Sequence, residues 1–89
     1  MKKYLVLNAD DFGMCKSANE AVFELFKSGD LLSAPIMLPC PAAEEAVQFS
    51  IDNPQYAIGN HTPLTSEWKK YRWKPLTDGK RLLDPAGYM

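Results

Sequence analysis

Apolar residues occur along the chain in short runs separated by polar turns. The run at residues 3–8, KYLVLN, has the length of a strand and is closed by a polar turn. A second run, LSAPIML at residues 32–38, predicts a buried strand in which Pro35 lacks a backbone donor. A third run, YAIGNH at residues 56–61, predicts another brief strand. Together these runs predict a small sheet.

Two longer segments between these runs have the apolar spacing of helices. Ser17 with Glu20 three positions later fits a capping box, and Gly29 stands where a helix ends, so we expect a helix over residues 17–30. The segment 41–54 begins with a proline and early glutamates and ends at an Asn-Pro pair, which predicts a second helix. The expected core-facing positions are Ala21, Val22, Leu25 and Phe26 in the first helix, and Ala46, Val47, Ser50 and Ile51 in the second.

The order strand, helix, strand, helix, strand predicts an α/β fold. Strands connected through a helix run parallel, with right-handed crossovers. The residues that follow parallel strands meet at one edge of the sheet: Asp10 and Asp11 after the first strand, Cys40 after the second and His61 after the third. Ligands and catalytic groups of α/β folds usually lie at this carboxyl edge. The sequence therefore predicts a site there.

Length and composition restrict the class of protein. A chain of 89 residues holds at most one domain, and a hydrophobic content of 46% excludes a disordered chain. The net charge of −1 does not indicate a nucleic-acid partner, and the apolar runs are too short to cross a membrane. The first residues lack the features of a signal peptide, so we expect a cytoplasmic protein. Cys15 and Cys40 are expected to be free thiols, because two distant cysteines indicate neither a disulfide framework nor a zinc knuckle.

The adjacent carboxylates Asp10 and Asp11 are the strongest chemical signal in the chain. They repel each other unless a cation or a shared proton compensates, and a metal ion is the simplest compensation. One carboxylate could bind the ion while the other acts as a general base, although solvated turn residues are the alternative. His61, the only histidine, is expected at the same edge and predicts a second ligand. A hydrolytic site generally has three protein ligands, and the sequence offers no third.

The segment 62–76 interleaves Trp68, Tyr71 and Trp73 with four basic residues. Such a segment can stack on nucleobases, provide flat platforms for sugar rings, or cover a small core with basic stems. The last residues contain turn signals and no closing strand or helix. A three-stranded parallel sheet would then keep an exposed edge, so we expect a truncated chain or completion by another chain.

Three stretches together resemble the YdjC-like carbohydrate deacetylase family: NADDFG after the first strand, GNH after the third, and LTSEWKKYRWKPL downstream. The resemblance runs from residue 4 to about residue 88. It implies a TIM-barrel-like (β/α) deacetylase fold of roughly 250 residues. Residues 1–89 would then be a single partial domain, the N-terminal βαβαβ portion and about the first third of that barrel.

The resemblance also implies roles for particular residues. Asp11 and His61 look like metal ligands for a divalent ion, Mg or Zn, and Asp10 looks like the catalytic base. Trp68 and Trp73 would line the cleft for an acetylated amino sugar or oligosaccharide, whose N-acetyl group would be hydrolysed. The family's third ligand, a later histidine, has no counterpart in this chain. The stretch GNHTPLT departs from the family's usual G-[IVL]-H-L-T-L-T by Asn60 and by Thr62-Pro63.

Two alternatives remain at this point. A receiver-type phosphotransfer module also has an acid pair after its first strand, but it needs an aspartate where His61 stands. A non-catalytic chain would act only through association with another chain, by its exposed edge and its aromatic-basic segment. Neither nucleic acid nor membrane is expected as a partner, and self-association into a homo-oligomer is left open.

Overall fold

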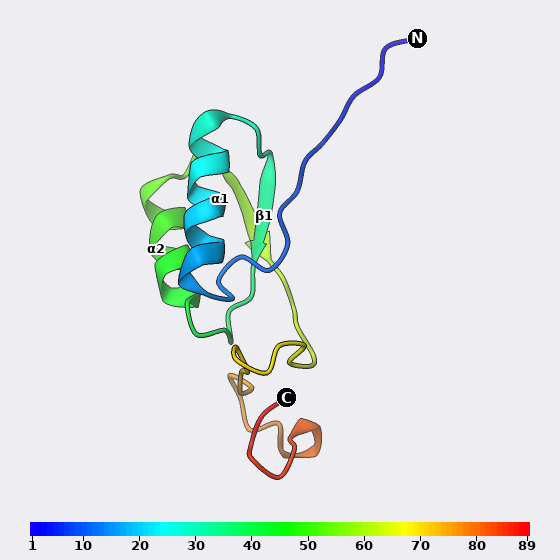
Figure 1. Ribbon diagram of the computed structural model, residues 1–89, viewed down its shortest axis with the longest axis vertical. Coiled ribbons are helices and arrows are strands. Elements are labelled where there is room, and N and C mark those ends of the chain that lie inside the picture. The colour runs from blue at the N-terminus through cyan, green and yellow to red at the C-terminus, as the bar shows by residue number, and fades with distance from the viewer.

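A computed structural model describes residues 1–89 of the protein as a small α/β unit followed by an irregular C-terminal segment (Figure 1). The elements in chain order are α1 (Lys16–Ser28), β1 (Ser33–Ile36), α2 (Ala43–Asp52), β2 (Ala57–Asn60) and the 3₁₀ helix η1 (Lys80–Leu82).

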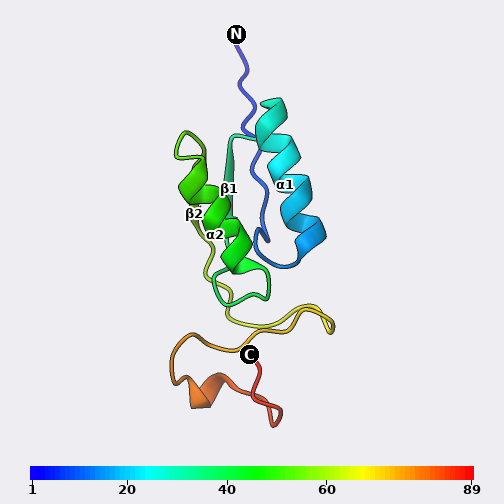
Figure 2. The ribbon, with the colours of Figure 1, turned by 90° about the vertical axis from the view of Figure 1, so that its left-hand side faces the viewer.

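The strands β1 and β2 pair in parallel, in a register that runs from Ser33 opposite Ala57 to Ile36 opposite Asn60. The crossover between them is α2, as the sequence predicts for a parallel pair. Both helices lie on the same face of this sheet (Figures 1 and 2). The predicted α/β class is therefore confirmed.

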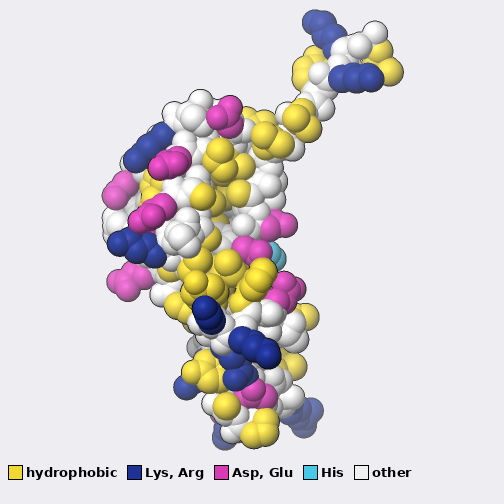
Figure 3. All heavy atoms as spheres, viewed as in Figure 1, with side chains coloured by type: hydrophobic (Ala, Val, Ile, Leu, Met, Phe, Trp, Pro, Cys, Tyr) yellow, Lys and Arg dark blue, Asp and Glu magenta, His cyan; other side chains and the backbone are white.

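The expected first strand, residues 3–8, is wrong for most of its length. The chain pairs with β1 only through isolated parallel bridges, Asn8 opposite Ser33 and Phe12 opposite Ile36. The apolar run at residues 4–7 is exposed instead of buried and projects from the rest of the molecule (Figures 1 and 3). The physical reason is that an apolar run is buried only where another layer covers it, and the helices cover β1 and not this run.

Helix α1 begins two residues earlier than the capping-box interpretation requires, at Lys16 instead of Ala18. Cys15 is the N-cap, with extended backbone angles of φ −155° and ψ 167°, and no side chain caps the helix there. Ser17 is the second helical residue, so it cannot be the N-cap and the predicted capping box is wrong. The C-terminal prediction is confirmed: Gly29 has a left-handed backbone, with φ 82°, and its N–H donates to a carbonyl of the last turn.

The faces that the helices turn to the core agree in part with the expected ones: Val22, Phe26 and Ala46 are buried, as predicted. In α1 the buried residues are Asn19, Val22 and Phe26, whereas Leu25 is 42% exposed. In α2 the buried residues are Ala43 and Ala46, and Ile51 is exposed. Alanines face the core in α2 because this side packs closely against α1 and β1.

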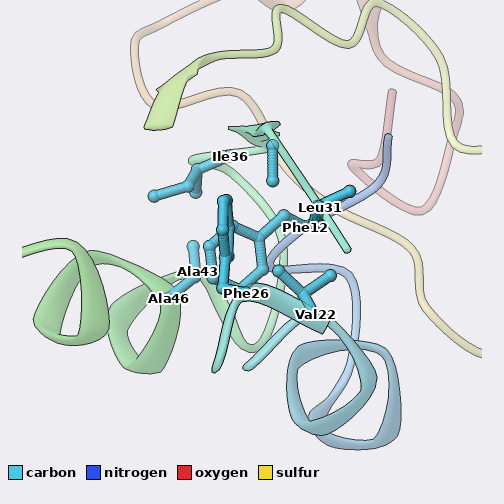
Figure 4. Packing of buried hydrophobic residues seen from close by; sticks show 8 residues of the cluster. Phe12, Val22, Phe26, Leu31, Ile36, Ala43 and Ala46 are labelled. Carbon is cyan, nitrogen blue, oxygen red and sulfur yellow. The ribbon is translucent and has the colours of Figure 1, made fainter. Parts of the chain in front are cut away.

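The main core lies between the two helices and the sheet (Figure 4). Phe12, from the NADDFG stretch, is fully buried in it and meets the edges of the rings of Phe23 and Phe49. A side chain buried so completely fixes the position of its own backbone, and therefore of its neighbour Asp11. The cluster consists of Phe12, Val22, Phe26, Leu31, Ala34, Ile36, Ala43 and Ala46.

The C-terminal segment lies beyond the carboxyl edge of the sheet and is held by a few specific contacts (Figures 1 and 2). The N–H of Ser66 donates to the Met89 carbonyl over 2.9 Å, and the N–H of Met89 donates to the Trp73 carbonyl over 3.1 Å. Arg72 forms an ion pair with Asp84 and lies over the ring of Tyr88. The longest helix has 13 residues, and no helix here has both the length and the apolar character needed to cross a membrane.

Candidate functional site

Three chain segments meet at the carboxyl edge, as the order of elements predicts. The N–H of Met37, just past β1, donates to the Phe12 carbonyl over 2.8 Å, and the N–H of His61, just past β2, donates to the Ile36 carbonyl over 2.9 Å. These two backbone bonds bring the side chains of Asp11 and His61 to neighbouring positions on this edge.

Asp11 and His61 face each other without a direct hydrogen bond. Nδ1 of His61 lies 3.9 Å from Oδ1 of Asp11, which is too long for a hydrogen bond. Nδ1 is buried and has no other partner. Leaving a buried polar atom unpaired costs about 1–3 kcal/mol, so this arrangement calls for a physical reason. A ligand between the two side chains would supply one.

The donor pair fits part of a divalent-metal site. Zinc–nitrogen and zinc–carboxylate bonds are each about 2.0–2.2 Å long, so two atoms 3.9 Å apart are near the separation at which both can bind one ion. A nitrogen and an oxygen donor suit zinc, magnesium or other divalent ions. No cluster of three or more His, Cys, Asp or Glu side chains that could hold a metal is present. The chain thus offers two ligands.

Asp10, the residue before Asp11, is exposed. The amide nitrogen of Asn8 donates to Oδ1 of Asp10 over 2.8 Å, and Oδ1 of Asn8 accepts a hydrogen bond from the Ser33 hydroxyl over 2.7 Å. This hydrogen-bonded series connects Asp10 to the first residue of β1. The sequence interpretation missed Asn8 and Ser33, because nothing in their spacing shows that two such distant residues meet.

A cavity of about 260 Å³ opens beside the Asp11–His61 pair. Both predicted tryptophans contribute to its wall, but they differ in exposure: Trp68 is 51% exposed, whereas Trp73 is 3% exposed and packs against Met37 and Cys40. The indole Nε1 of Trp73 is buried without a partner. Asp10 is not part of the wall. The lining residues are Asp11, Met37, His61, Thr62, Pro63, Leu64, Thr65, Glu67, Trp68 and Trp73.

Glu67 is a cavity residue that the sequence interpretation passed over, although it stands directly before Trp68 in the aromatic-basic segment. The residues at which the chain departs from the family pattern interact with each other: the amide nitrogen of Asn60 donates to the Thr62 hydroxyl over 3.1 Å. This bond spans His61 and ties together the residues on either side of it.

Cys40 lies at the same edge of the sheet, but its thiol is buried and protonated. It is 6% exposed, and burial together with the nearby Asp11 carboxylate raises the pKa of its thiol to about 11. Cys40 is therefore a neutral thiol at physiological pH. Both cysteines are free, as predicted, and Cys15 is partly exposed.

Asn19 was also missed, and a signal for it exists in the sequence. It occupies a core-facing slot of α1, three positions before Val22, and it is fully buried. A polar residue within an apolar helical face needs hydrogen-bond partners in the core, so the position of Asn19 in the sequence alone predicts a buried, hydrogen-bonded side chain.

The chain is similar to several known proteins. Residues 4–89 match the family described as YdjC-like protein. The chain is 37% identical over 87 residues to a carbohydrate deacetylase of Geobacillus stearothermophilus, and this alignment covers 98% of this chain and 33% of that protein. It is likewise 37% identical over 87 residues to a chitooligosaccharide deacetylase of Yersinia enterocolitica, covering 98% of this chain and 32% of that protein.

A solved structure shows the same fold. A protein from Enterococcus faecalis V583, named as a cellobiose-phosphate cleavage protein, superposes with a TM-score of 0.76 at 32% identity. The alignment covers 94% of this chain and 32% of that one. The chain thus spans about a third of the length of the relatives that it matches. Because the family match extends over nearly all of its residues, the chain belongs to the YdjC-like protein family.

Proposed function

We propose that this chain carries part of the active site of a metal-dependent carbohydrate deacetylase, a hydrolase that removes N-acetyl groups from amino sugars or oligosaccharides. The observation that carries the proposal is the Asp11 carboxylate facing the unpartnered Nδ1 of His61 across 3.9 Å, at the carboxyl edge of a parallel sheet. The names of the relatives, carbohydrate deacetylase and chitooligosaccharide deacetylase, supply the reaction.

The fold that we propose for the whole enzyme is a TIM-barrel-like (β/α) fold of which this chain is the N-terminal portion. Parallel strands occur almost only where both faces of the sheet are covered. Here both helices lie on one face, which Ala34 and Ile36 of β1 share as buried residues, while Ser33 and Pro35 of the alternate face are partly exposed. The chain also spans about a third of its relatives. A barrel interior would cover the second face.

The site residues divide the work in this proposal. His61 and Asp11 would hold a divalent ion, Mg or Zn. When bound, such an ion polarises a carbonyl and lowers the pKa of a bound water. Asp10 takes the proton from the attacking water, and Asn8 orients the Asp10 carboxylate through the 2.8 Å hydrogen bond.

The cavity wall offers the contacts that a sugar requires. The half-exposed ring of Trp68 provides a face for stacking, and the carboxylate of Glu67 next to it can accept hydrogen bonds from hydroxyls. Trp73 is too deeply buried to stack on a ring, so it contributes to the wall instead of a platform.

A chimaera tests the proposal in a complete enzyme. Residues 4–89 would replace the matching third of the Geobacillus stearothermophilus carbohydrate deacetylase, and acetate release from N-acetylated oligosaccharides would be measured with added Zn²⁺ or Mg²⁺. We expect an active chimaera. Asp10→Asn should lower kcat by about 10²–10⁴-fold, as loss of a general base does, while metal content stays near stoichiometric.

The ligand variants separate metal binding from proton transfer. Asp11→Asn and His61→Gln should reduce metal content and activity together, whereas Lys70→Gln, in the basic segment outside the cavity wall, should reduce neither. An active chimaera that keeps its metal and its rate after both ligand substitutions would refute the assignment of these ligands.

A further inference from the structure

Asn19 is the one fully buried polar side chain of the core. It projects from the first turns of α1, on the face that also holds Val22 and Phe26. Burying an amide without partners is unfavourable, and Asn19 avoids this penalty by hydrogen bonds to two other parts of the chain.

The hydrogen bonds of Asn19 connect the acid-bearing loop to α2. Its Oδ1 accepts from the N–H of Gly13 over 2.8 Å, and its amide nitrogen donates to the Ala42 carbonyl over 2.9 Å and to the Glu45 carboxylate over 3.3 Å. The Gly13 carbonyl in turn accepts from the N–H of Ala42 over 3.0 Å. Asn19, Gly13 and Ala42 therefore form a closed set of hydrogen bonds.

The loop that Asn19 holds contains a strained residue. Asp11 has φ 63°, a left-handed backbone that is unfavourable for a residue other than glycine. Such conformations persist where neighbouring contacts determine them, and they are frequent at functional sites. Two anchors follow directly in the chain: buried Phe12 and Gly13, which itself has φ 95°.

The backbone of Gly13 is packed tightly, which restricts the conformation of the loop that contains Asp11. A Cβ at this position would lie 3.2 Å from Cα of Ala43 and 3.3 Å from Cγ2 of Ile36, so the backbone sits directly against α2 and β1. The hydrogen bond that the Gly13 N–H donates to Oδ1 of Asn19 ties this tight position to α1 as well. Loss of that bond would remove the hydrogen-bonded connection between α1 and Gly13, two residues after the left-handed Asp11.

We infer that Asn19 is a positioning residue, which holds the Asp10–Gly13 loop so that the Asp11 carboxylate faces His61. The inference rests on the proposed function only in taking Asp11 and His61 as metal ligands. Partners that orient ligands in this indirect way typically change metal affinity by 10–100-fold when they are lost.

The test uses the 89-residue chain labelled with ¹⁵N and compares Asn19→Ala with Asn53→Ala. Asn53 is a matched control, because its amide nitrogen also donates to a backbone carbonyl, that of Phe49, but at the far end of α2. Amide signals and hydrogen exchange of Asp11, Phe12 and Gly13 report on the loop. Mn²⁺ titration, followed by broadening of signals near Asp11 and His61, reports on the metal site.

We expect Asn19→Ala to shift the three loop signals, to remove the exchange protection of the Gly13 amide, and to raise the Mn²⁺ concentration for half broadening by about tenfold or more. Asn53→Ala should leave all three readouts unchanged. If Asn19→Ala unfolds the chain, Asn19→Asp replaces it: its carboxyl oxygen still accepts from the Gly13 N–H, so the Gly13 amide should keep its exchange protection, and loss of that protection would overturn the inference.

Unchanged loop signals in Asn19→Ala, or equal shifts in Asn53→Ala, would overturn the inference. Absence of Mn²⁺ broadening in the unsubstituted chain would show instead that the Asp11–His61 pair does not bind the ion without a further ligand, which concerns the metal site and not Asn19. The loop signals would still decide the positioning role of Asn19 in that case, so the two failures can be told apart.

Discussion

At the scale of single residues, the ionisation of the Cys40 thiol, beside the candidate site, makes the free energy of unfolding depend on pH. The thiol lies against Met37 and Trp73, and burial first, then the Asp11 carboxylate, raises its pKa to about 11. In the unfolded chain the thiol ionises near its ordinary pKa of about 8.5. Between these two pKa values the folded state therefore keeps a proton that the unfolded state loses. The contribution of Cys40 to stability is complete below about pH 8.5 and is lost as the pH rises towards 11.

Urea denaturation at several pH values between 7 and 10.5 checks this expectation. The free energy of unfolding of the unsubstituted chain should fall more steeply above pH 8.5 than that of Cys40→Ala, which has no thiol to titrate. Lysine and tyrosine side chains also titrate in this range, but they are the same in both proteins. Parallel pH profiles would show that Cys40 does not contribute.

The residues of the candidate site differ in how far the sequence could predict them. Asp11 and His61 follow from one rule, because parallel strands bring their carboxyl ends together, and the structure places the two side chains 3.9 Å apart. Asn8 and Asn19 act through hydrogen bonds to residues 23 to 26 positions away. Such pairings depend on the final packing of elements, which periodicity does not describe.

At the scale of elements, the end of α1 is set by the backbone of Gly29. This residue has φ 82°, and a Cβ there would meet nothing within 4 Å. Any effect of adding a methyl group is therefore conformational and not steric crowding. Gly29→Ala should lower the free energy of unfolding by about 1–2 kcal/mol, the cost of a left-handed backbone in an L-residue.

Gly59 provides the matched control for this substitution. A Cβ at Gly59 would also meet nothing within 4 Å, but its φ is not in the left-handed range. Gly59→Ala should therefore change the unfolding free energy by less than about 0.5 kcal/mol, as ordinary surface substitutions do. Equal losses in both variants, measured by urea denaturation, would show that φ does not determine the cost.

The start of α1 leaves room for a stabilising substitution. Cys15 has the extended backbone of an N-cap, yet no side-chain hydrogen bond caps the helix. Serine is among the strongly preferred N-cap residues, so Cys15→Ser should raise the unfolding free energy by about 0.5–1 kcal/mol. Ser17→Ala, inside the helix, should not reproduce the loss that a true N-cap would give. Thermal unfolding of both variants compares the two positions, and a larger effect at Ser17 would restore the capping-box interpretation.

The elements also show where sequence periodicity is sufficient. The helix α2 and the strands β1 and β2 lie within the predicted ranges, and α1 begins one residue before its predicted range, because apolar periodicity and helix-ending signals act locally. The run at residues 4–7 was expected to be buried on apolar character alone, and it is exposed. Burial requires a second layer of helices or strands packed against the run, and the sequence of the run alone does not show whether such a layer is present.

At the scale of the whole molecule, the apolar run at residues 4–7 is the main exposed apolar segment with no neighbouring strand. Tyr4, Leu5 and Val6 are each at least 67% exposed, and they lead directly into the segment that bridges to β1 (Figure 3). Contiguous exposed apolar residues next to unpaired backbone donors and acceptors favour association with a further chain. In this state the molecule offers its own copies a surface to pair with.

We therefore expect the 89-residue chain to self-associate as its concentration rises, and Val6→Lys to shift the association to higher concentration, because a charge on an exposed edge opposes pairing. Sedimentation velocity over a range of concentrations measures this. Ile51→Lys is the control: it adds the same charge to a side chain that is 66% exposed on α2, away from the run. A larger effect of Ile51→Lys would place the contact on the helical face, and a chain that stays monomeric throughout would exclude self-association through either surface.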